Sequence, residues 1–249
     1  MKNRLLLISI GLSCFLLFMV VKLPASIAYE LAGKRIQGLE MLQLSGSVWS
    51  GQAGSIKVLG HSFRNLHWTL SPLALLVGDV ALDIDIRDTD YPLQGDINLA
   101  FNGDFQAQGL KGKLPAALLN QIPVLAFIRL SGNMIIDMQS ISYLQKELQQ
   151  AQGNIMLEQG YLQQPVQTEL GNIKMNLDTR PGVITVSIKD EQAPIGIDGQ
   201  LLLNPGHKFS FKALFSPTVK ADNVIISMLK NAGKLHSDGS MTIQYEGIY

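Results

Sequence analysis

The chain is poor in the residue types on which most protein chemistry depends. It has a single cysteine, Cys14, so it can form neither an internal disulfide framework nor a thiol-based metal site. Charged residues make up only 16% of the 249 positions, and the 20 basic residues balance the 20 acidic ones. A net charge of zero without a basic stripe argues against nucleic acid as a partner, because that partner requires clustered Lys and Arg. The composition is also too apolar for a disordered chain.

Histidine is scarce as well, and its positions indicate no active site. The four histidines, His61, His67, His207 and His236, show no H-x-x-x-H or equivalent spacing, so neither a metal centre nor a catalytic triad is indicated. The sequence also lacks a Gly-rich phosphate loop and a nucleophile elbow. We therefore expect a protein that is not an enzyme and has no cofactor, and we assign no catalytic, cofactor-binding or metal residues.

One acidic cluster stands out in the segment DIDIRDTD, which contains Asp83, Asp85, Asp88 and Asp90. Carboxylates at alternating strand positions could hold Ca²⁺, but the segment lacks the central Gly and the closing Glu of an EF-hand loop. The favoured interpretation is a solvated strand edge, whose charges deter pairing with another sheet.

The N-terminal region carries the longest apolar run. Leu5–Val21 contains no charged residue, and its 17 positions would span roughly 26 Å as a helix, close to the ~30 Å hydrocarbon core of a bilayer. Lys2 and Arg4 precede the run, so the positive-inside bias predicts a cytoplasmic N-terminus with the bulk of the chain beyond the membrane. The sequence thus predicts a single transmembrane anchor over residues 1–23.

The alternative interpretation of this region is a cleaved signal peptide. Ser26 and Ala28 stand where a small-x-small cleavage site would lie, and cleavage there would release a secreted soluble domain. The apolar run is longer than the ~7 to 15 residues of a usual signal h-region, which favours the anchor. Cys14 lies inside the run and is interpreted as a small, membrane-embedded apolar residue.

Beyond the anchor, residues 24–37 predict a short helical stalk, and residues 38–249 predict a β-rich domain. Within that domain apolar and polar residues alternate over several short segments. The clearest are Val80–Ile86, Ile173–Leu177 and Ile184–Ile188. Strands with one apolar and one polar face are typical of antiparallel sheet.

Two later segments interrupt the strand pattern. Lys113–Ile128 predicts one or two short helices, with Pro115 near a first turn and Pro123 at the start of a second piece. The other helix is predicted from Asp222, which can cap it, to Gly233, which closes it.

Two tryptophans lie in strand-like patterns in a chain that is only 7% aromatic. Trp49 belongs to LSGSVWSG (Leu44–Gly51), and Trp68 opens WTLSP (Trp68–Pro72). We expect both to be buried anchors of one core, because a buried indole contributes a large apolar area.

The second half of the domain resembles the first. A shift of 107 residues places Trp49 over Met156 and Trp68 over Met175, and it preserves the order of several strands, a helical break and a final strand. We therefore predict two pseudo-repeats, about residues 38–139 and 145–246, that extend one curved antiparallel β-sheet with short helices.

The chain resembles the type II secretion system protein N family. The matching elements are LPA (Leu23–Ala25), LSGSVWSGQA (Leu44–Ala53), WTLSPLALLVGD (Trp68–Asp79) and IGIDGQLLL (Ile195–Leu203). The resemblance implies a single-pass inner-membrane protein whose periplasmic β domain contacts other subunits of the secretion system, either the inner-membrane platform or the outer-membrane channel. Such a protein would support export of folded proteins across the outer membrane. The resemblance carries over no catalytic residues.

A second resemblance is to AsmA-like proteins, whose curved sheets offer an apolar β groove for lipid, which would make phospholipid a partner. One structural feature distinguishes a lipid-binding module from a domain that only contacts other subunits. It is whether the apolar faces of Val80–Ile86 and Ile184–Ile188 close on a filled core or line an open trough.

Overall fold

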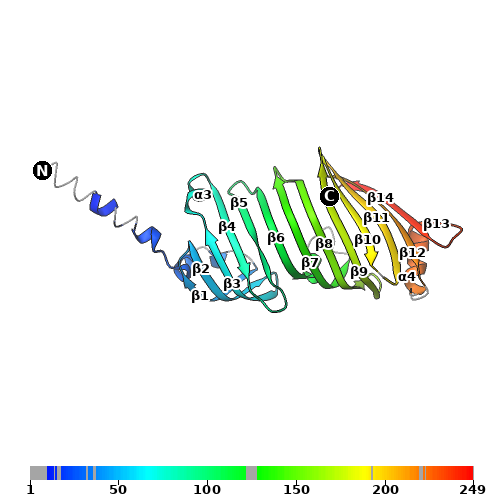
Figure 1. The fold of residues 1–249 in the computed structure, drawn as a ribbon, viewed down its shortest axis with the longest axis horizontal. Coiled ribbons are helices and arrows are strands. Elements are labelled where there is room, and N and C mark those ends of the chain that lie inside the picture. Colours follow the sequence, from blue (N-terminus) through cyan, green and yellow to red (C-terminus); the bar gives the residue numbers. More distant parts are fainter. Residues whose placement is uncertain are drawn as a thin grey trace.

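The computed structural model describes residues 10–13, 15, 18–31, 33–35, 38–121, 128–191, 193–218, 221 and 223–248. Most of them belong to one 14-stranded sheet, whose strands follow the sequence from β1 to β12 and end with β14 and then β13. Every neighbouring pair is antiparallel. Figure 1 shows the strands side by side along the long axis, with the N-terminal helical segment projecting from the end that holds β1. The prediction of a mainly β, antiparallel chain is confirmed.

The strands are β1 (Leu39–Gly46), β2 (Ser50–Val58), β3 (His61–Leu70), β4 (Asp79–Ile86), β5 (Leu93–Ala100), β6 (Phe105–Pro115), β7 (Arg129–Leu144), β8 (Glu147–Gln164), β9 (Thr168–Arg180), β10 (Val183–Glu191), β11 (Ile195–Asn204), β12 (Lys208–Pro217), β13 (Lys234–Leu235) and β14 (Met241–Ile248). The helical segments after the N-terminal one are α2 (Ala25–Leu31), η1 (Gly33–Arg35), α3 (Pro72–Leu76), η2 (Ala116–Gln121) and α4 (Asn223–Ala232).

The predicted anchor is described only in part. Residues 10–13, 15 and 18–21 are helical, and the other positions of the apolar run, together with Lys2 and Arg4, lie outside the described residues. In the part of the chain that the structure describes, no helix is both long enough and apolar enough to cross a membrane.

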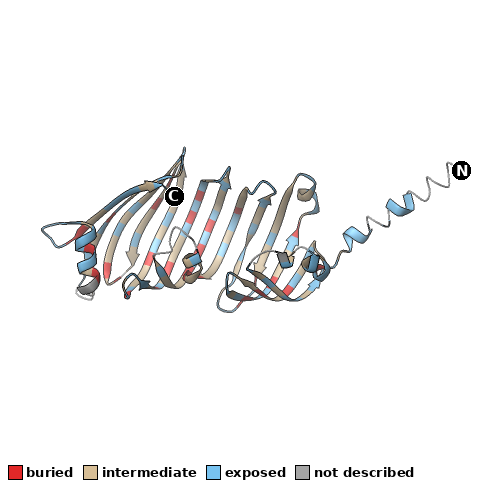
Figure 2. Ribbon diagram, turned by 180° about the vertical axis from the view of Figure 1, so that it is seen from behind, coloured by how far each residue is buried: buried red, intermediate tan, exposed pale blue. Residues whose placement is uncertain are grey.

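Alternation along the strands directs apolar side chains to one face of the sheet, and α2, η2 and α4 lie on that face at its beginning, middle and end (Figure 2). Buried residues form three clusters along it. The first centres on Phe63 and Leu66 of β3, and the second on Met138 of β7 and Ile184 of β10. In the third, Leu229 of α4 packs with Met241 of β14.

The first tryptophan motif is a hairpin rather than one continuous strand. β1 ends at Gly46, whose φ of +83° suits glycine, and the N–H of Ser47 donates to the carbonyl of Ser50 at 2.9 Å. Val48 and Trp49 therefore occupy the tip of a two-residue turn. The apolar and polar alternation continued through this turn, so periodicity alone did not reveal it.

The predicted helical breaks are partly confirmed. β6 continues to Pro115, which ends the strand rather than starting a helix, and a short 3₁₀ helix, η2, follows. Residues 122–127, including Pro123, lie outside the described residues. α4 forms where a helix was expected and ends with the N–H of Gly233 donating to the carbonyl of Leu229 at 2.9 Å. Asp222, its expected cap, is outside the described part.

One other expectation is wrong, and the structure adds detail to the predicted stalk. The acidic segment is not a sheet edge, because β4 pairs with β3 on one side and with β5 on the other. The segment expected as a stalk is helical in α2 and η1, but α2 lies against the sheet, with Ala25 only 4% exposed.

The order of elements is similar in the two halves of the domain. Strands β2 to β6, η2 and β7 are matched in sequence by β8 to β12, α4 and β14, whereas β1, α3 and β13 have no counterpart. The internal duplication itself stays a prediction.

Candidate functional site

The most distinctive feature of the first half is an apolar cavity of about 720 Å³ between the sheet, α2 and η2. Its walls come from β1 to β6, with α2 at one side and Leu118 of η2 at the other. The lining residues are Ala25, Ala28, Tyr29, Gly33, Leu39, Met41, Leu44, Val48, Ile56, Val58, Phe63, Leu66, Trp68, Leu70, Val80, Leu82, Ile84, Ile86, Leu93, Ile97, Leu114 and Leu118. We call this cavity the groove. Its size and lining are typical of sites for small apolar ligands.

The two strands singled out as discriminating behave differently. Val80, Leu82, Ile84 and Ile86 of β4 all line the groove. The corresponding face of β10 is closed, since Ile184 is only 2% exposed and belongs to the second buried cluster. β4 thus lines an open trough, whereas β10 faces a filled core.

The few polar atoms in the groove lining are already satisfied. The Tyr29 hydroxyl donates to the Leu39 carbonyl at 3.3 Å and accepts from the Met41 N–H at 3.0 Å. The indole N–H of Trp68 donates to the Val48 carbonyl at 3.0 Å. An occupant would therefore be held by its apolar surface, because a polar group placed here would lose water without gaining a partner.

Tyr29 also explains why α2 covers this end of the sheet. Its hydroxyl bonds to the main chain of β1 on the side away from β2, where an edge strand would otherwise expose free backbone groups. Sequence reasoning missed this contact, because the spacing of apolar residues in a short helix does not say what the helix packs against.

Both tryptophans are only half-buried, so the prediction that both are buried anchors of one core is only partly correct. Trp68 is half-buried and packs against the first cluster, with its ring over Gly51, where a Cβ atom would collide with the ring. Trp49 is half-buried too, but its indole N–H donates to the carbonyl of Val20 at 2.9 Å. Trp68 therefore supports the groove wall, whereas Trp49 holds the end of the N-terminal helix.

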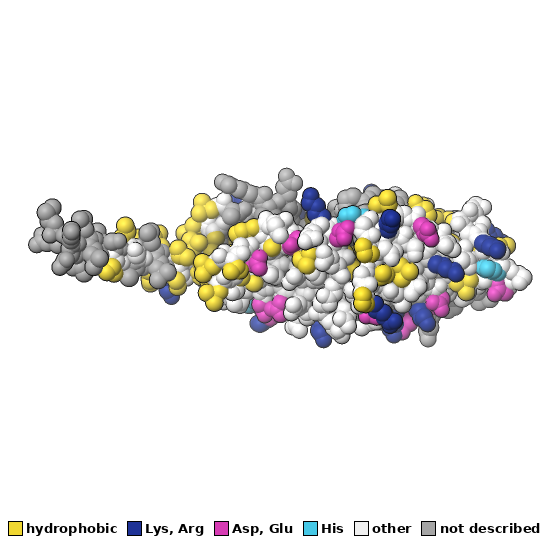
Figure 3. Space-filling view, turned by 90° about the horizontal axis from the view of Figure 1, so that it is seen from above, with side chains coloured by type: hydrophobic (Ala, Val, Ile, Leu, Met, Phe, Trp, Pro, Cys, Tyr) yellow, Lys and Arg dark blue, Asp and Glu magenta, His cyan; other side chains and the backbone are white. Residues whose placement is uncertain are grey.

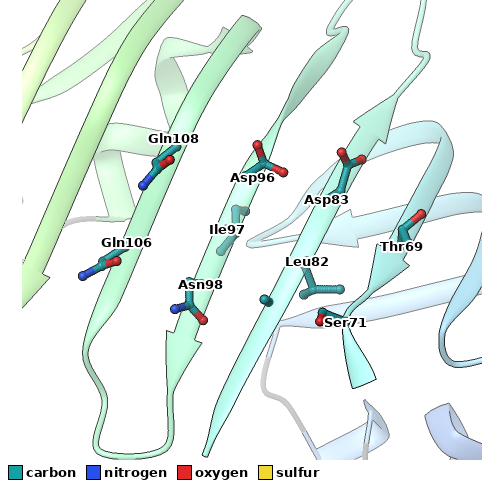
Figure 4. A pocket seen from close by; sticks show the side chains of 10 residues that line it. Thr69, Ser71, Leu82, Asp83, Asp96, Ile97, Asn98, Gln106 and Gln108 are labelled. Carbon is teal, nitrogen blue, oxygen red and sulfur yellow. The ribbon is translucent and has the colours of Figure 1, made fainter. Parts of the chain in front are cut away.

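A second hollow, of about 390 Å³, lies on the opposite face of β4 and β5 and is more polar (Figure 4). Asp83 and Asp96 sit directly across from each other on neighbouring strands, with Gln108 beside them on β6. Facing carboxylates on adjacent strands are unfavourable. No group of three or more His, Cys, Asp or Glu able to hold a metal ion occurs among the residues described.

The aspartates of the acidic segment have different structural roles. Asp83 faces β5, and Asp85 pairs with Arg87 at 2.7 Å. Asp88 is buried and accepts from the backbone N–H groups of Arg64 and Asp90, both at 2.8 Å. Burial alone would raise the pKa of Asp88, but these backbone hydrogen bonds outweigh it and leave the pKa below its ordinary value of 3.8.

Three of the four histidines make separate polar contacts. His67 lies near the carbonyl of Asn65 at 3.3 Å, His207 near Glu147 at 3.7 Å, and His236 near the hydroxyl of Thr242 at 2.8 Å. His61 and His67 belong to β3, whereas His207 lies in the β11–β12 turn and His236 in the turn between β13 and β14.

These features define a class of protein: a long antiparallel sheet with an apolar trough in its first half. The sequence comparisons give the family. Residues 37–244 match the family model described as type II secretion system (T2SS), protein N, and the chain belongs to that family.

Three relatives called type II secretion system protein N are similar to the chain. The one from Vibrio cholerae is 25% identical over 202 residues, covering 80% of each chain. The one from Aeromonas hydrophila is 22% identical over 252 residues, covering 99% of each. The one from Klebsiella pneumoniae is 21% identical over 252 residues, covering 99% of this chain and 97% of the relative. No solved structure matches the chain.

Proposed function

We propose that the protein is an inner-membrane component of the type II secretion system that supports export of folded proteins across the outer membrane. The family match over residues 37–244 carries this proposal. The apolar run Leu5–Val21, preceded by Lys2 and Arg4, supports a single-pass topology with a cytoplasmic N-terminus and a periplasmic sheet.

We further propose the division of the chain into a transmembrane anchor over residues 1–23, a short helical stalk over 24–37 and a periplasmic β-rich domain over 38–249. The repeated order of strands and helices supports two pseudo-repeats within that domain, about 38–139 and 145–246.

The outer edge of β14 is our candidate contact with another subunit of the system. β13 is only two residues long and covers β14 only at Met241 and Thr242. Beyond Thr242, no described strand pairs with the outer side of β14, where Tyr245 is 63% and Ile248 is 77% exposed. An extended segment of a partner can add to such an edge through main-chain hydrogen bonds.

The register identifies which residues of β14 offer these groups. The N–H of His236 donates to the carbonyl of Ser240 at 2.9 Å across the β13–β14 hairpin, so Ser240 directs its backbone away from β12. Alternate residues of an antiparallel strand bond to the same side. Gln244 and Glu246 therefore present their backbone N–H and C=O groups to the free edge.

Gln244→Pro removes one outward N–H while leaving the ladder with β12 intact, and Gln244→Ala is the matched control that keeps the N–H. In a strain lacking the gene, we expect the alanine variant to restore secretion and the proline variant to leave exported proteins in the periplasm. Fractionation of culture medium and periplasm measures this. Equal secretion with both variants would refute the edge contact, and normal secretion without any copy of the gene would refute an essential role.

The groove favours a second candidate function, the binding of a phospholipid acyl chain. The observation that carries it is a cavity of about 720 Å³ with an apolar lining whose two polar groups are internally satisfied. This function is compatible with the first, because a secretion component could be built on a lipid-binding sheet.

Leu82→Trp would fill the groove, whereas Asp83→Trp, one residue further along β4, adds the same bulk to the opposite face. We expect phospholipid that co-purifies with the full-length protein to fall several-fold in the first variant only. Native mass spectrometry measures the bound lipid, and thermal melts verify that both variants fold. Equal lipid in both variants would show that the bound molecules surround the anchor rather than fill the groove.

A further inference from the structure

The first half of the sheet exposes a group of large apolar side chains at one rim. In α3 and the residue after it, Leu73 is 75%, Leu76 is 82% and Val77 is 78% exposed, and Phe101 in the β5–β6 turn is 73% exposed. We call these four residues the apolar tip. Contiguous exposed apolar side chains of this size mark a contact with a partner or a membrane. Figure 3 shows apolar side chains gathered at the end of the sheet that adjoins the N-terminal helical segment.

The tip is one connected unit. The N–H of Phe101 donates to the carbonyl of Gly78 at 3.0 Å, which ties the β5–β6 turn to the end of α3. α3 begins at Pro72, with one residue between it and the end of β3, and its five residues PLALL include no charged or polar side chain. A helix this short and this apolar has no polar face of its own to present to water.

Hydrogen bonds also connect the tip to the N-terminal helical segment. The N–H of Leu70, at the end of β3, donates to the carbonyl of Trp49 at 2.7 Å. The indole N–H of Trp49 in turn donates to the carbonyl of Val20 at 2.9 Å, and the N–H of Val48 donates to the carbonyl of Leu23 at 3.0 Å. The end of the N-terminal helix and the start of α3 are thus fixed on either side of the β1–β2 turn.

The strand order places all these turns on one rim. In an antiparallel meander, successive hairpins alternate between the two rims, so the β1–β2, β3–β4 and β5–β6 connections lie together. The β2–β3 turn, which holds Leu59, lies on the other rim. β1 begins on that other rim, where the N–H of Leu59 donates to the carbonyl of Gly38 at 3.1 Å. The Pro24–Ser47 bridge and the hydrogen bond from Val48 to Leu23 nevertheless place the end of the N-terminal helix on the rim that carries the apolar tip.

We propose that the apolar tip rests in the interface of the same bilayer that holds the N-terminal anchor. This inference depends on the membrane anchor of the proposed function. The described residues of the anchor expose apolar side chains, with Leu12 at 57%, Phe15 at 58% and Phe18 at 61%. A bilayer can cover both the apolar tip and the anchor, because the exposed residues named on both surfaces offer no specific polar contacts to a protein partner. Apolar side chains can enter the interface of a bilayer to a depth of about 5–10 Å. The contact places Leu70, which lines the groove and precedes α3, close to the lipid.

The test uses the full-length protein in liposomes that contain nitroxide-labelled phospholipid. The sole native cysteine is removed by Cys14→Ser, and a fluorescent bimane is attached to one new cysteine at a time. Leu73→Cys and Leu76→Cys report on the tip, and Phe15→Cys reports on the anchor. Leu59→Cys is the matched control, since Leu59 is an exposed leucine, at 48%, on the opposite rim.

We expect the nitroxide lipids to quench the two tip labels about twofold or more over the Leu59 label. Quenching of the Phe15 label alone, with the tip labels equal to the Leu59 label, would overturn the inference and leave the anchor standing. An unquenched Phe15 label would refute the anchor and the inference together. Tip labels that report an apolar environment without lipid quenching would show that a protein surface covers the tip, which also overturns the inference.

Discussion

Removal of the Asp88 side chain tests the buried turn that joins β4 to β5. The Asp88 side chain is only 4% exposed and accepts three backbone hydrogen bonds, from Arg64 and Asp90 at 2.8 Å and from Tyr91 at 3.2 Å. The guanidinium of Arg64 adds a contact at 3.3 Å. One carboxylate thus connects the middle of β3 to the chain that leaves β4.

The expected cost follows from these donors. A hydrogen bond to a charged group contributes about 1.5–3 kcal/mol, and several bonds to one carboxylate are not additive because water can reach part of the turn in the variant. We expect Asp88→Ala to lower the free energy of unfolding by about 2–4 kcal/mol. For a domain of this size that corresponds to a fall in Tm of about 4–16 °C.

The pH dependence has a definite sign. The pKa of Asp88 is lower in the folded protein than its ordinary value of 3.8, since burial, which raises it, is outweighed by the backbone hydrogen bonds. Its contribution to stability is therefore present above the unfolded pKa and is lost as the pH falls through the folded pKa. The Tm difference between wild type and Asp88→Ala should be largest near neutral pH and shrink below 3.8.

Circular dichroism melts of the full-length protein in detergent, from pH 7 down to pH 3, measure both effects. Asp83→Ala is the matched control, because Asp83 is exposed and faces Asp96, so its removal should leave Tm unchanged or raise it slightly. A Tm for Asp88→Ala equal to that of Asp83→Ala at neutral pH would refute a structural role for the buried carboxylate.

Two further predictions concern the tryptophan motifs. Trp68→Ala should lower stability by about 2–4 kcal/mol, more than the ~1–2 kcal/mol of Trp49→Ala, because the Trp68 ring packs against the first cluster, to which Trp49 does not belong. Urea denaturation of both variants measures the difference, and the reverse order would contradict these assignments. Gly51→Ala should cost about 2 kcal/mol or more, because its Cβ would meet the Trp68 ring and lie 2.8 Å from the Ser47 carbonyl oxygen. A melt identical to wild type would show that the turn can move to admit the methyl group.

Much of the fold could be predicted from alternation, because one buried face determines where each strand's apolar residues lie. The strand pattern of Val80–Ile86 and Ile184–Ile188 predicted antiparallel sheet correctly, and the closing Gly233 marked the end of α4. The β1–β2 turn was missed, because Val48 and Trp49 happened to continue the alternation through it.

The candidate sites were harder to predict, because each depends on contacts between distant residues. Nothing near Tyr29 in the sequence indicated that its hydroxyl would bond to the edge of β1. The sequence also did not distinguish Asp88, whose carboxylate is buried, from the aspartates around it. The apolar tip had a readable signal, the run LALLV (Leu73–Val77) directly after a proline, in a segment too short to bury itself.

The contrast between the two halves of the sheet shows what strand periodicity cannot decide. β4 and β10 alternate in the same way, yet β4 lines the groove and β10 faces a filled core. The difference lies in what covers each strand. Ala116 of η2 is fully buried in the second cluster, and Leu119 packs against it, whereas α2 reaches the groove mainly through Ala25 and Tyr29 and leaves a cavity beside them. If the halves arose by duplication, the open trough is therefore a property of the covering segments, and changes in α2 would alter the groove without altering the sheet.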